Sequence, residues 1–398
     1  MKDDLLPLPQ FAAPELYAPG ALSRNGVDHQ TVASPREGAG ATRGTHVVEI
    51  ADREQWNRLV LARPHYELEQ GWEWGEVRRG SGWTPHRYAV FAAEACAGVV
   101  SVASGRIPGL PCSVLDACRG PLLDWQDDGV WRCLLPAIRH LADRERAVLL
   151  RLSPSVPHDD VGFRDALARH GFQPLADDWT TWSPARAVVT LRLDGDEDAL
   201  RRRCRKSVRN EIAAARRRGV TVRMARERTE LVAFHRLMVT AGRQKGYPVR
   251  PLSRLEALWD AYAVRGNGVL LLAEYRGALV GGLLGTRMGQ RAYLQATGVV
   301  RTDERVYQGA LLYWEFIRWV KAAGCIHLDW GGSGTRFPPR ETDQGYGLYQ
   351  FKAGFGSELH YCAPYHDLVF RPQLYRLGRA FERWALPRAW RLRALLNH

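Results

Sequence analysis

Two passages of the chain, far apart in the sequence, share one pattern: an amphipathic helix, a short turn and an apolar strand. The first passage is Leu134–Ser153 and the second is Gly309–Trp330. In each, apolar residues recur at helical spacing and are followed by a run with the length of a buried strand. This repetition predicts two halves of similar fold that arose by duplication, although two generic helix–strand passages can also resemble each other by chance.

The segments around these passages alternate between strand and helix patterns. We expect strands and helices in these places: strands at 46–50, 88–92, 99–104, 188–193, 269–275, 279–288 and 292–298, and helices at 198–218 and 229–244. An α/β (α+β) chain of this kind predicts two subdomains, each with a mixed, mostly antiparallel sheet flanked by helices. We place the first at 46–185 and the second at 186–370.

The two ends of the chain differ from this core. Residues 1–45 are rich in Pro and Gly and show no sustained period, which is typical of a disordered tail. Residues 371–398 interleave Arg with Leu, Phe and Trp. Such a basic amphipathic segment can lie on an anionic membrane, or it can pack against the second subdomain.

The chain is strongly basic. Its 398 residues include 56 Lys and Arg against 43 Asp and Glu, which gives a net charge of +13. This balance favours polyanionic partners such as nucleic acid, phosphate-bearing substrates or an anionic membrane surface. A GC-rich genome would explain the use of Arg in place of Lys, but not the excess over acids.

The cysteines give no sign of a metal site. The seven Cys residues are scattered, without the spacing of a metal centre, and we interpret them as reduced thiols of a cytoplasmic protein. The sequence holds no apolar run of about 18 residues that would span a membrane. Met1–Asp4 lacks the basic and apolar regions of a signal peptide.

The most specific stretch is Gly347–Gly356, with the sequence GLYQFKAGFG, which follows a strand bearing Asp329, Gly331 and Gly332. It resembles the closing signature of the Fem family, the aminoacyl-tRNA-dependent transferases that build peptidoglycan cross-bridges. Further blocks similar to that family occur in the same order: Gln70–Arg78, Arg119–Asp124, Arg209–Ile212, Arg243–Tyr247 and Tyr293–Thr297. The resemblance covers roughly residues 46–370.

The resemblance implies two GNAT-like subdomains side by side, in agreement with the duplication inferred above. It also implies transfer of an amino acid from aminoacyl-tRNA, as co-substrate, to an amine of a peptidoglycan precursor such as lipid II or a UDP-linked pentapeptide. We expect no other cofactor and no metal. No Ser/His/Asp nucleophile pattern occurs, so we expect direct attack of the amine on the ester.

The Phe351–Lys352 pair is the expected catalytic centre by this resemblance. A cation aimed at the developing oxyanion contributes roughly 3–4 kcal/mol to such a reaction. The local sequence alone would also suit a surface lysine in a Gly-rich turn. Asp124 is a candidate for orienting or deprotonating the attacking amine. We interpret Asp329 as fixing the Gly-Gly loop that follows it.

A second group of residues is expected to bind the acceptor substrate. By resemblance, Arg78 and Arg243 hold its diphosphate, a role that suits the planar guanidinium fork. Arg78 stands where the family usually has Lys, and each arginine could instead be a solvated helix-face residue. Tyr247 and Tyr293 could donate hydrogen bonds in the same cleft, or could be buried structural tyrosines.

The helix expected at 198–218 is a candidate tRNA-binding surface. Among its many arginines, Arg205, Arg209 and Arg216 are the residues that we assign to phosphate contacts with the acceptor stem. A charge run of this kind is also common on a solvated helix face.

Three other functions remain open at this point. An acyl-CoA-dependent GNAT enzyme would carry a Gly-rich turn that binds pyrophosphate, but Arg305–Ala310 lacks the first glycine of that turn. A tRNA-dependent enzyme could act on a peptide antibiotic instead of the cell wall. A non-catalytic nucleic-acid-binding protein could use the same fold.

Overall fold

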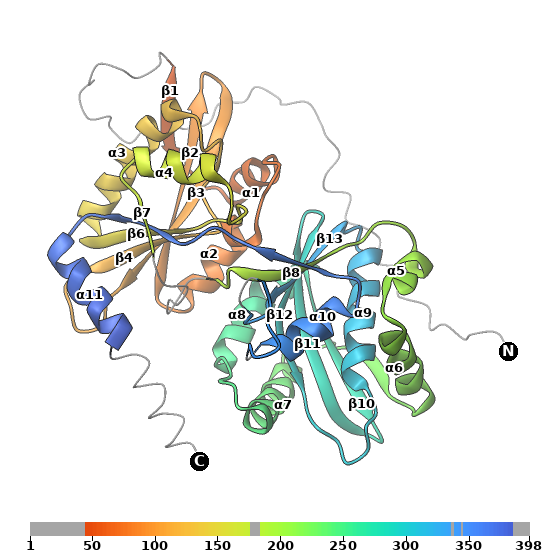
Figure 1. Cartoon of the computed structure of the whole chain (residues 1–398). Coiled ribbons are helices and arrows are strands. Elements are labelled where there is room, and N and C mark those ends of the chain that lie inside the picture. The colour runs from red at the N-terminus through yellow and green to blue at the C-terminus, as the bar shows by residue number, and fades with distance from the viewer. Residues whose placement is uncertain (1–43, 176–183, 336–337, 344, 385–398) are drawn as a thin grey trace.

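The computed structural model describes residues 44–175, 184–335, 338–343 and 345–384. It consists of two lobes, each built on one sheet (Figure 1). The tail expected at 1–45 lies outside the described residues except at its end, where Thr45 begins the first strand. Residues 385–398 of the expected C-terminal segment also lie outside them. The expected α/β class with two mixed sheets is confirmed.

The first sheet has eight strands. In spatial order they are β1 (Thr45–Glu49), β2 (Trp83–Ala92), β3 (Ala95–Arg106), β4 (Ser113–Cys118), β6 (Ala147–Ser153), β15 (His366–Val369) and β7 (Gln173–Pro174), with β5 (Leu122–Leu123) paired to β3. Only β4 and β6 run parallel. The helical elements of this half are α1 (Arg53–Leu61), η1 (Leu68–Gln70), α2 (Trp72–Arg79), α3 (Asp128–Arg144) and α4 (Val161–Arg169).

The second sheet has seven strands. Their order is β14 (Glu358–Tyr361), β8 (Ala187–Arg192), β13 (His327–Gly332), β12 (Arg291–Val299), β11 (Ala278–Met288), β10 (Gly268–Tyr275) and β9 (Thr221–Met224). Only β12 and β13 are parallel. The helical elements of this half are α5 (Glu197–Arg203), α6 (Lys206–Arg217), α7 (Glu230–Lys245), α8 (Leu252–Tyr262), η2 (Ala263–Arg265), α9 (Gln308–Ala322) and α10 (Tyr346–Ala353), and the last described helix, α11 (Pro372–Trp384), follows β15 in the chain.

The predicted repeat is present in both halves. In the first half, α3 lies between β4 and β6 in the chain, and in the second half α9 lies between β12 and β13. In each case the helix joins the two parallel strands of its sheet, as a crossover connection requires. The two passages that the sequence singled out are therefore equivalent parts of two similar sheets.

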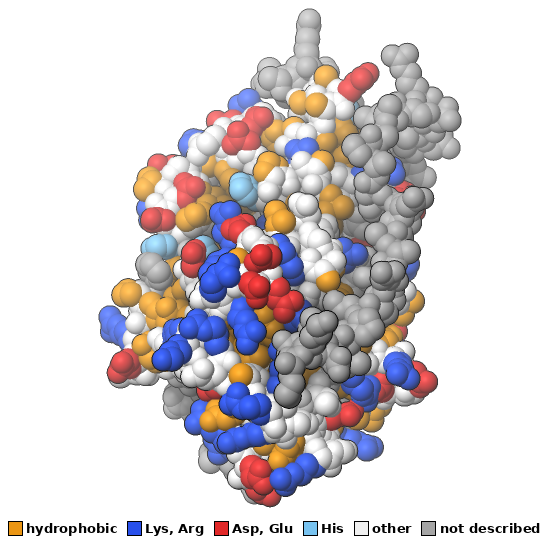
Figure 2. Space-filling view, turned by 90° about the vertical axis from the view of Figure 1, so that its right-hand side faces the viewer, with side chains coloured by type: hydrophobic (Ala, Val, Ile, Leu, Met, Phe, Trp, Pro, Cys, Tyr) orange, Lys and Arg blue, Asp and Glu red, His pale blue; other side chains and the backbone are white. Residues whose placement is uncertain are grey.

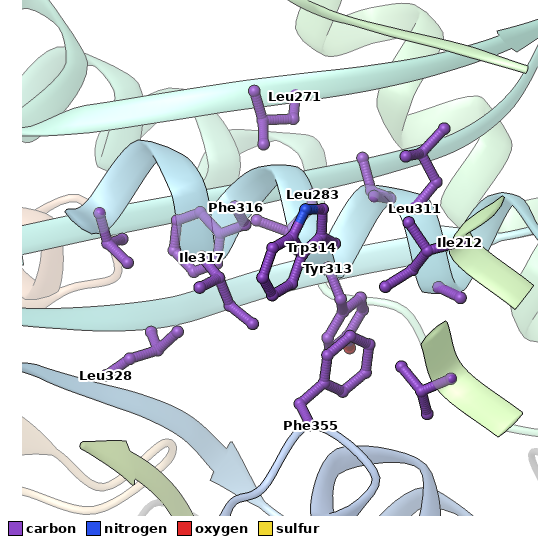
Figure 3. Close-up of a cluster of buried hydrophobic side chains, with 14 of the residues drawn as sticks. Ile212, Leu271, Leu283, Leu311, Tyr313, Trp314, Phe316, Ile317, Leu328 and Phe355 are labelled. Atoms are coloured by element: carbon purple, nitrogen blue, oxygen red, sulfur yellow. The ribbon is translucent and has the colours of Figure 1, made fainter. Parts of the chain in front are cut away.

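Helix α9 forms the core of the second half, as Figure 3 shows. Leu312, Trp314, Phe316 and Ile317 are almost fully buried, because apolar residues surround this helix on all sides. On β11, Gly285 leaves the space that the Phe316 ring fills, since a Cβ at this position would overlap the ring.

A shared apolar cluster joins the two halves. It contains Trp56 and Val77 from the helices of the first half, and Phe234 and Leu255 from α7 and α8 of the second. Burial of such large side chains on both sides of the boundary stabilises the contact by roughly 25 cal/mol per Å² of apolar surface. The halves therefore share one apolar cluster, beside a separate cluster within each half.

The chain returns to the first sheet at its C-terminal end, which corrects the boundary expected at residue 370. Strand β15 pairs with β6, and Arg151 Nε and Nη2 each donate to the Asp367 carboxylate over 2.8 Å in a fully buried ion pair. The Tyr375 hydroxyl of α11 donates to the same carboxylate. Residues 366–384 thus pack on the first half, which Figure 1 shows as a blue strand and helix among the orange and yellow elements.

The basic helix expected at 198–218 is two helices. The chain leaves helical geometry at Cys204 and Arg205, where the Arg205 N–H donates to the carbonyl of Gly354 over 2.8 Å. Arg209 donates to the carbonyls of Arg202 and Cys204, which fills the gap in the helical hydrogen-bond ladder. The break therefore connects the basic region to the end of α10. Among the helices that the structure describes, none is long and apolar enough to cross a membrane.

Candidate functional site

The end of β13 is bent by its own side chain. The Gly331 N–H donates to Asp329 Oδ1 over 2.5 Å, and Gly331 has a positive φ of 73°. The pairing of β13 with β8 is interrupted between Asp329 and Gly332. These contacts confirm the interpretation that Asp329 fixes the Gly-Gly loop.

Lys352 lies in α10 and is 3% exposed. Its ammonium donates to the carbonyls of Trp330, Gly331 and Gly332 over 2.8, 3.3 and 2.7 Å. Burial lowers the pKa of Lys352 from 10.5 to about 8, and Asp329 opposes that shift. The alternative of a surface lysine is excluded, and all three donors of the ammonium are engaged with carbonyls at the end of β13.

Phe351 is part of an aromatic cluster beside this lysine. Its ring is 4.9 Å from that of Tyr313 and 5.4 Å from that of Phe355, both in edge-on geometry. An added Cβ on Gly309, near the beginning of α9, would lie 3.9 Å from the Phe351 ring. Phe351 therefore connects α10 to the start of α9.

A cavity of about 350 Å³ lies between the two sheets. Residues of both halves line it: Glu67, Arg119, Ser155, Val156, Pro157 and His158 from the first, and Val188, Thr190, Arg291, His327, Asp329, Leu359, His360, Tyr361 and Cys362 from the second and the returning chain. Arg119 and Ser155 follow β4 and β6, so the carboxyl ends of that parallel pair open into the cavity. Asp329 links the cavity to the loop that Lys352 holds.

Opposite charges meet across this boundary. Glu67 Oε1 is 3.5 Å from Arg291 Nη2, and the Tyr293 hydroxyl donates to Glu67 Oε2 over 3.3 Å. The same hydroxyl accepts from the N–H of Leu68. Burial raises the pKa of Glu67, while Arg291 and Arg119 oppose the rise. Tyr293 is therefore a buried hydrogen-bonding residue at the edge of the site.

Two neighbouring groups are also shifted. Burial, with Glu67 nearby, raises the pKa of the partly buried Glu69 to about 7. Burial and Arg291 lower the pKa of His327 to about 4, so this imidazole is neutral at pH 7. Strongly shifted pKa values cluster at functional sites, so these groups make the cavity the candidate site.

Arg119 is held rigidly at the wall of the cavity. Its Nη2 donates to the carbonyl of Ala185 over 2.8 Å, and its Nη1 to Cys362 Sγ over 3.4 Å. Its backbone has a positive φ of 55°, which is uncommon for a residue with a side chain. The sequence included Arg119 in a family-like block without giving it a role. Glu67, Arg291 and His327 carried no local signal at all.

The structure does not place Arg78 and Arg243 in this cavity. Arg78 lies in α2, forms an ion pair with the buried Asp116, and stacks over the Trp83 ring at 3.9 Å. It is therefore a buried, paired arginine and not the solvated residue of the alternative reading. Arg243 is exposed near the end of α7, and Tyr247, which is 38% exposed, follows it. Helix α8 packs against both α2 and α7.

Asp124 lies outside the cavity as well. It is exposed, and its carboxylate accepts the N–H of Gln126 over 2.9 Å in the turn that leads to α3. The geometry gives no support to the expected role of Asp124 with the attacking amine.

The residues assigned to tRNA lie on or beside the exposed side of α5 and α6. Arg205 is exposed, Arg209 is partly buried against the helix break, and Arg216 forms a 3.0 Å ion pair with Glu315. Figure 2, which views the molecule from the side of these helices, shows many Lys and Arg side chains on this face with acidic side chains among them. Contact with tRNA stays a prediction.

Comparisons with known proteins agree with this architecture. The acetyltransferase (GNAT) domain family matches residues 202–339. The lipid II:glycine glycyltransferase of Staphylococcus aureus is 24% identical over 236 residues, covering 56% of this chain and 53% of that protein. The chain thus spans about half the length of the curated relatives it matches.

Solved structures extend the likeness to both halves. The crystal structure of FemX superimposes with a TM-score of 0.76 at 20% identity, over 83% of this chain and 99% of that chain. A tandem GNAT protein from the clavulanic acid biosynthesis pathway gives 0.51 at 17% identity, over 82% and 98%. The chain therefore has a tandem GNAT-like fold and is similar in sequence to the lipid II:glycine glycyltransferase over about half of its length.

Proposed function

We propose that this chain transfers an amino acid from aminoacyl-tRNA to an amine of a peptidoglycan precursor. The observation that carries the proposal is the homology to proteins named for glycine transfer to lipid II, together with a FemX-like fold over both halves. A charged cavity lined by residues of both halves supports it, because transfer between two large substrates needs one site that both can reach.

The reaction forms one bond and breaks another. The amine nitrogen attacks the carbonyl carbon of the aminoacyl ester, and the bond from that carbon to the ribose oxygen breaks. The amine loses one proton, and the departing ribose oxygen gains one. Holding the two substrates in attacking geometry supplies up to roughly 7–11 kcal/mol of the barrier reduction. Glu67, whose pKa is raised by burial, is placed to accept the proton of the amine.

Lys352 acts in this scheme through the loop that it holds. Its three N–H groups are bonded to three carbonyls, so contact with an oxyanion would require the release of one bond. In the described conformation it fixes the backbone between Asp329 and Gly332. We therefore treat Lys352 as a positioning residue and keep its direct role in catalysis as a prediction.

The exposed arginines of α5 and α6 suit the phosphates of a tRNA acceptor stem. Arg201, Arg202 and Arg217 are exposed on these helices, beside the three arginines assigned above. Binding through such contacts weakens steeply with salt, because each neutralised phosphate releases counterions. A tRNA donor would therefore dock on this face and present its ester toward the junction.

Helix α11 suits a lipid-linked acceptor. Leu377 and Phe381 are 69% and 61% exposed and lie one turn apart on the helix, while Arg376 and Arg379 stand beside them. An apolar face flanked by guanidinium groups binds an anionic membrane surface through burial of its apolar side chains and through attraction between opposite charges. We include peripheral contact of α11 with the inner membrane surface, and a cytoplasmic location, in the proposal.

The decisive assay supplies the purified protein with charged tRNAs and either lipid II or a UDP-linked MurNAc pentapeptide. We expect the acceptor mass to rise by one or more aminoacyl residues only when charged tRNA is present. The double variant Arg202→Glu/Arg217→Glu is expected to weaken tRNA binding at least tenfold, while Arg265→Glu on η2 serves as the control for a charge reversal outside these helices.

An acyl-CoA-dependent activity is the second candidate, because the matched domain family is an acetyltransferase family. At the start of α9, Gln308 donates to the carbonyl of Val300 over 2.7 Å, and Tyr307 has a positive φ of 59°. The helix N-terminus is thus structured without the missing glycine. Acetyl-CoA in a parallel reaction tests this candidate, and acceptor product in that arm alone would refute transfer from tRNA.

A further inference from the structure

We propose that the cavity between the two sheets recognises an acceptor amine whose own carbon also carries a carboxylate, as in the head group of an α-amino acid. This inference rests on the proposed function and specifies the acceptor. The geometry that leads to it is the presence of two guanidinium groups and two carboxylates around one cavity: Arg119, Arg291, Glu67 and Asp329.

The two guanidinium groups have hydrogen-bonding capacity left. Arg119 uses one Nη2 bond to Ala185 and one Nη1 contact to Cys362, and it forms no ion pair among the described residues. Arg291 donates from Nη1 to the carbonyl of Tyr66, approaches Glu67 only to 3.5 Å, and has a buried Nε without a partner. Guanidinium groups bind carboxylates through paired N–H donors. A ligand carboxylate between them would engage the remaining donors.

The two carboxylates provide hydrogen-bond acceptors beside these donors. Glu67 receives hydrogen bonds from the hydroxyls of Tyr293 and Ser155, and Asp329 has one oxygen engaged by the Gly331 N–H. Burial disfavours the charged form of Glu67, and a ligand ammonium would reverse that effect. The site thus offers acceptors for an ammonium beside donors for a carboxylate.

Charge balance and size narrow the ligand further. A plain alkyl ammonium would leave Arg119 without an anionic partner in a partly buried site and would compete with Arg291 for the Glu67 carboxylate, which is unfavourable. A zwitterionic head group satisfies both signs without adding net charge. The cavity of about 350 Å³ is at the small end of ligand sites, which range over roughly 300–1,000 Å³. It suits one amino-acid side chain and excludes the nucleotide, which must lie outside.

The test compares two UDP-linked MurNAc pentapeptides that differ only at the residue with the free side-chain amine. One carries lysine, whose amine carbon has no carboxylate, and the other carries diaminopimelate, whose amine carbon has one. Their dissociation constants are measured by isothermal titration calorimetry without tRNA. We expect the diaminopimelate form to bind at least tenfold more tightly, because charged hydrogen bonds to a carboxylate are gained.

Variants tie the preference to the cavity. Arg119→Gln and, separately, Arg291→Gln are expected to reduce the ratio of the two dissociation constants to within about twofold of one. Arg119→Lys should keep part of the preference for the diaminopimelate form. Arg106→Gln, at an exposed site at the end of β3, is the matched control and should keep the wild-type ratio. Circular dichroism melting curves confirm that each variant is folded.

Two results would overturn the inference: a wild-type ratio near one, including no binding of either peptide, or a preference that persists in both glutamine variants. The second result would mean that these arginines only neutralise Glu67 and Asp329. The binding measurement needs no donor. An absence of aminoacyl transfer would therefore refute the proposed function, whereas the binding ratio would still show whether the cavity prefers the diaminopimelate form.

Discussion

Replacement of Lys352 by methionine removes an ammonium from three backbone carbonyls while keeping most of the side-chain volume. Each hydrogen bond from a charged donor contributes about 1.5–3 kcal/mol net, so three contribute roughly 6 kcal/mol. Against this, the shift of the Lys352 pKa from 10.5 to about 8 corresponds to an unfavourable burial of charge of roughly 3 kcal/mol. The difference predicts a loss of about 3 kcal/mol in the free energy of unfolding.

The measurement is a thermal melt of wild type and Lys352→Met followed by near-UV circular dichroism. A loss of this size lowers the Tm by roughly 5 °C in a chain of this length. Lys321→Met is the matched control, because Lys321 donates to a single carbonyl, that of Leu193, over 2.6 Å. The Tm of Lys321→Met should fall by clearly less than the Tm of Lys352→Met.

The pH dependence gives an independent check. The folded protein releases the Lys352 proton near pH 8, whereas the unfolded chain holds it to about pH 10.5. Between these values the unfolded state binds more protons, so this group makes stability rise with pH. The gap in stability between wild type and Lys352→Met should therefore widen from pH 8 toward pH 10. An unchanged Tm at pH 7, with transfer activity lost, would refute the structural role and restore a purely chemical one.

Three further outcomes follow from the described contacts. Arg78→Met should lower the free energy of unfolding by about 3–5 kcal/mol in urea titrations, because it leaves the buried Asp116 carboxylate unpaired, and adding Asp116→Asn should recover part of the loss. Glu69 binds its proton up to about pH 7 in the folded state but only to about pH 4.5 when unfolded, so its contribution to stability is complete below pH 4.5 and disappears as the pH rises to 7. Glu69→Gln should flatten that decline in the free energy of unfolding. A variant with the same pH profile as wild type would contradict the pKa shift of Glu69. Leu377→Glu should reduce binding to phosphatidylglycerol vesicles about tenfold in a sedimentation assay, whereas Val264→Glu, at an equally exposed apolar site, should not; equal losses would argue against membrane contact through α11.

Much of the fold could be predicted because its signals are local. The helical stripe of α9 and the apolar run of β13 are readable from neighbouring residues, as are their counterparts α3 and β6. The boundary at residue 370 was wrong because β15 has only four residues, and its partner β6 lies more than 200 residues earlier in the chain. A strand this short carries too little pattern to specify its partner.

The basic helix is a second case in which local sequence pattern did not predict the structure. Residues 198–218 have continuous helical propensity, and no Gly or Pro interrupts them before Gly219. The break at Cys204 and Arg205 arises from a tertiary contact, the hydrogen bond from Arg205 to Gly354 at the end of α10. Propensity is a weak preference that such contacts override.

The candidate site was predicted in part. Lys352 and Asp329 were singled out by sequence, and the structure places them around one loop. Asp124, Arg78 and Arg243 belong to similar-looking blocks but lie outside the cavity. Family-like blocks mark positions that a fold needs, and whether a position faces the cavity depends on the packing around it.

Residues close together in the chain are enough to specify the repeated helix–strand units, the loop that Asp329 fixes and the basic character of the surface. Which charges share the cavity depends instead on how distant segments fold against each other. Tyr293 donates to Glu67 across a separation of 226 residues, and Arg291 and Arg119 approach the same carboxylate from different sheets. Local pattern shows whether a side chain is buried, but the charge that it meets, and so its pKa and its chemistry, is set by the chain segment folded against it.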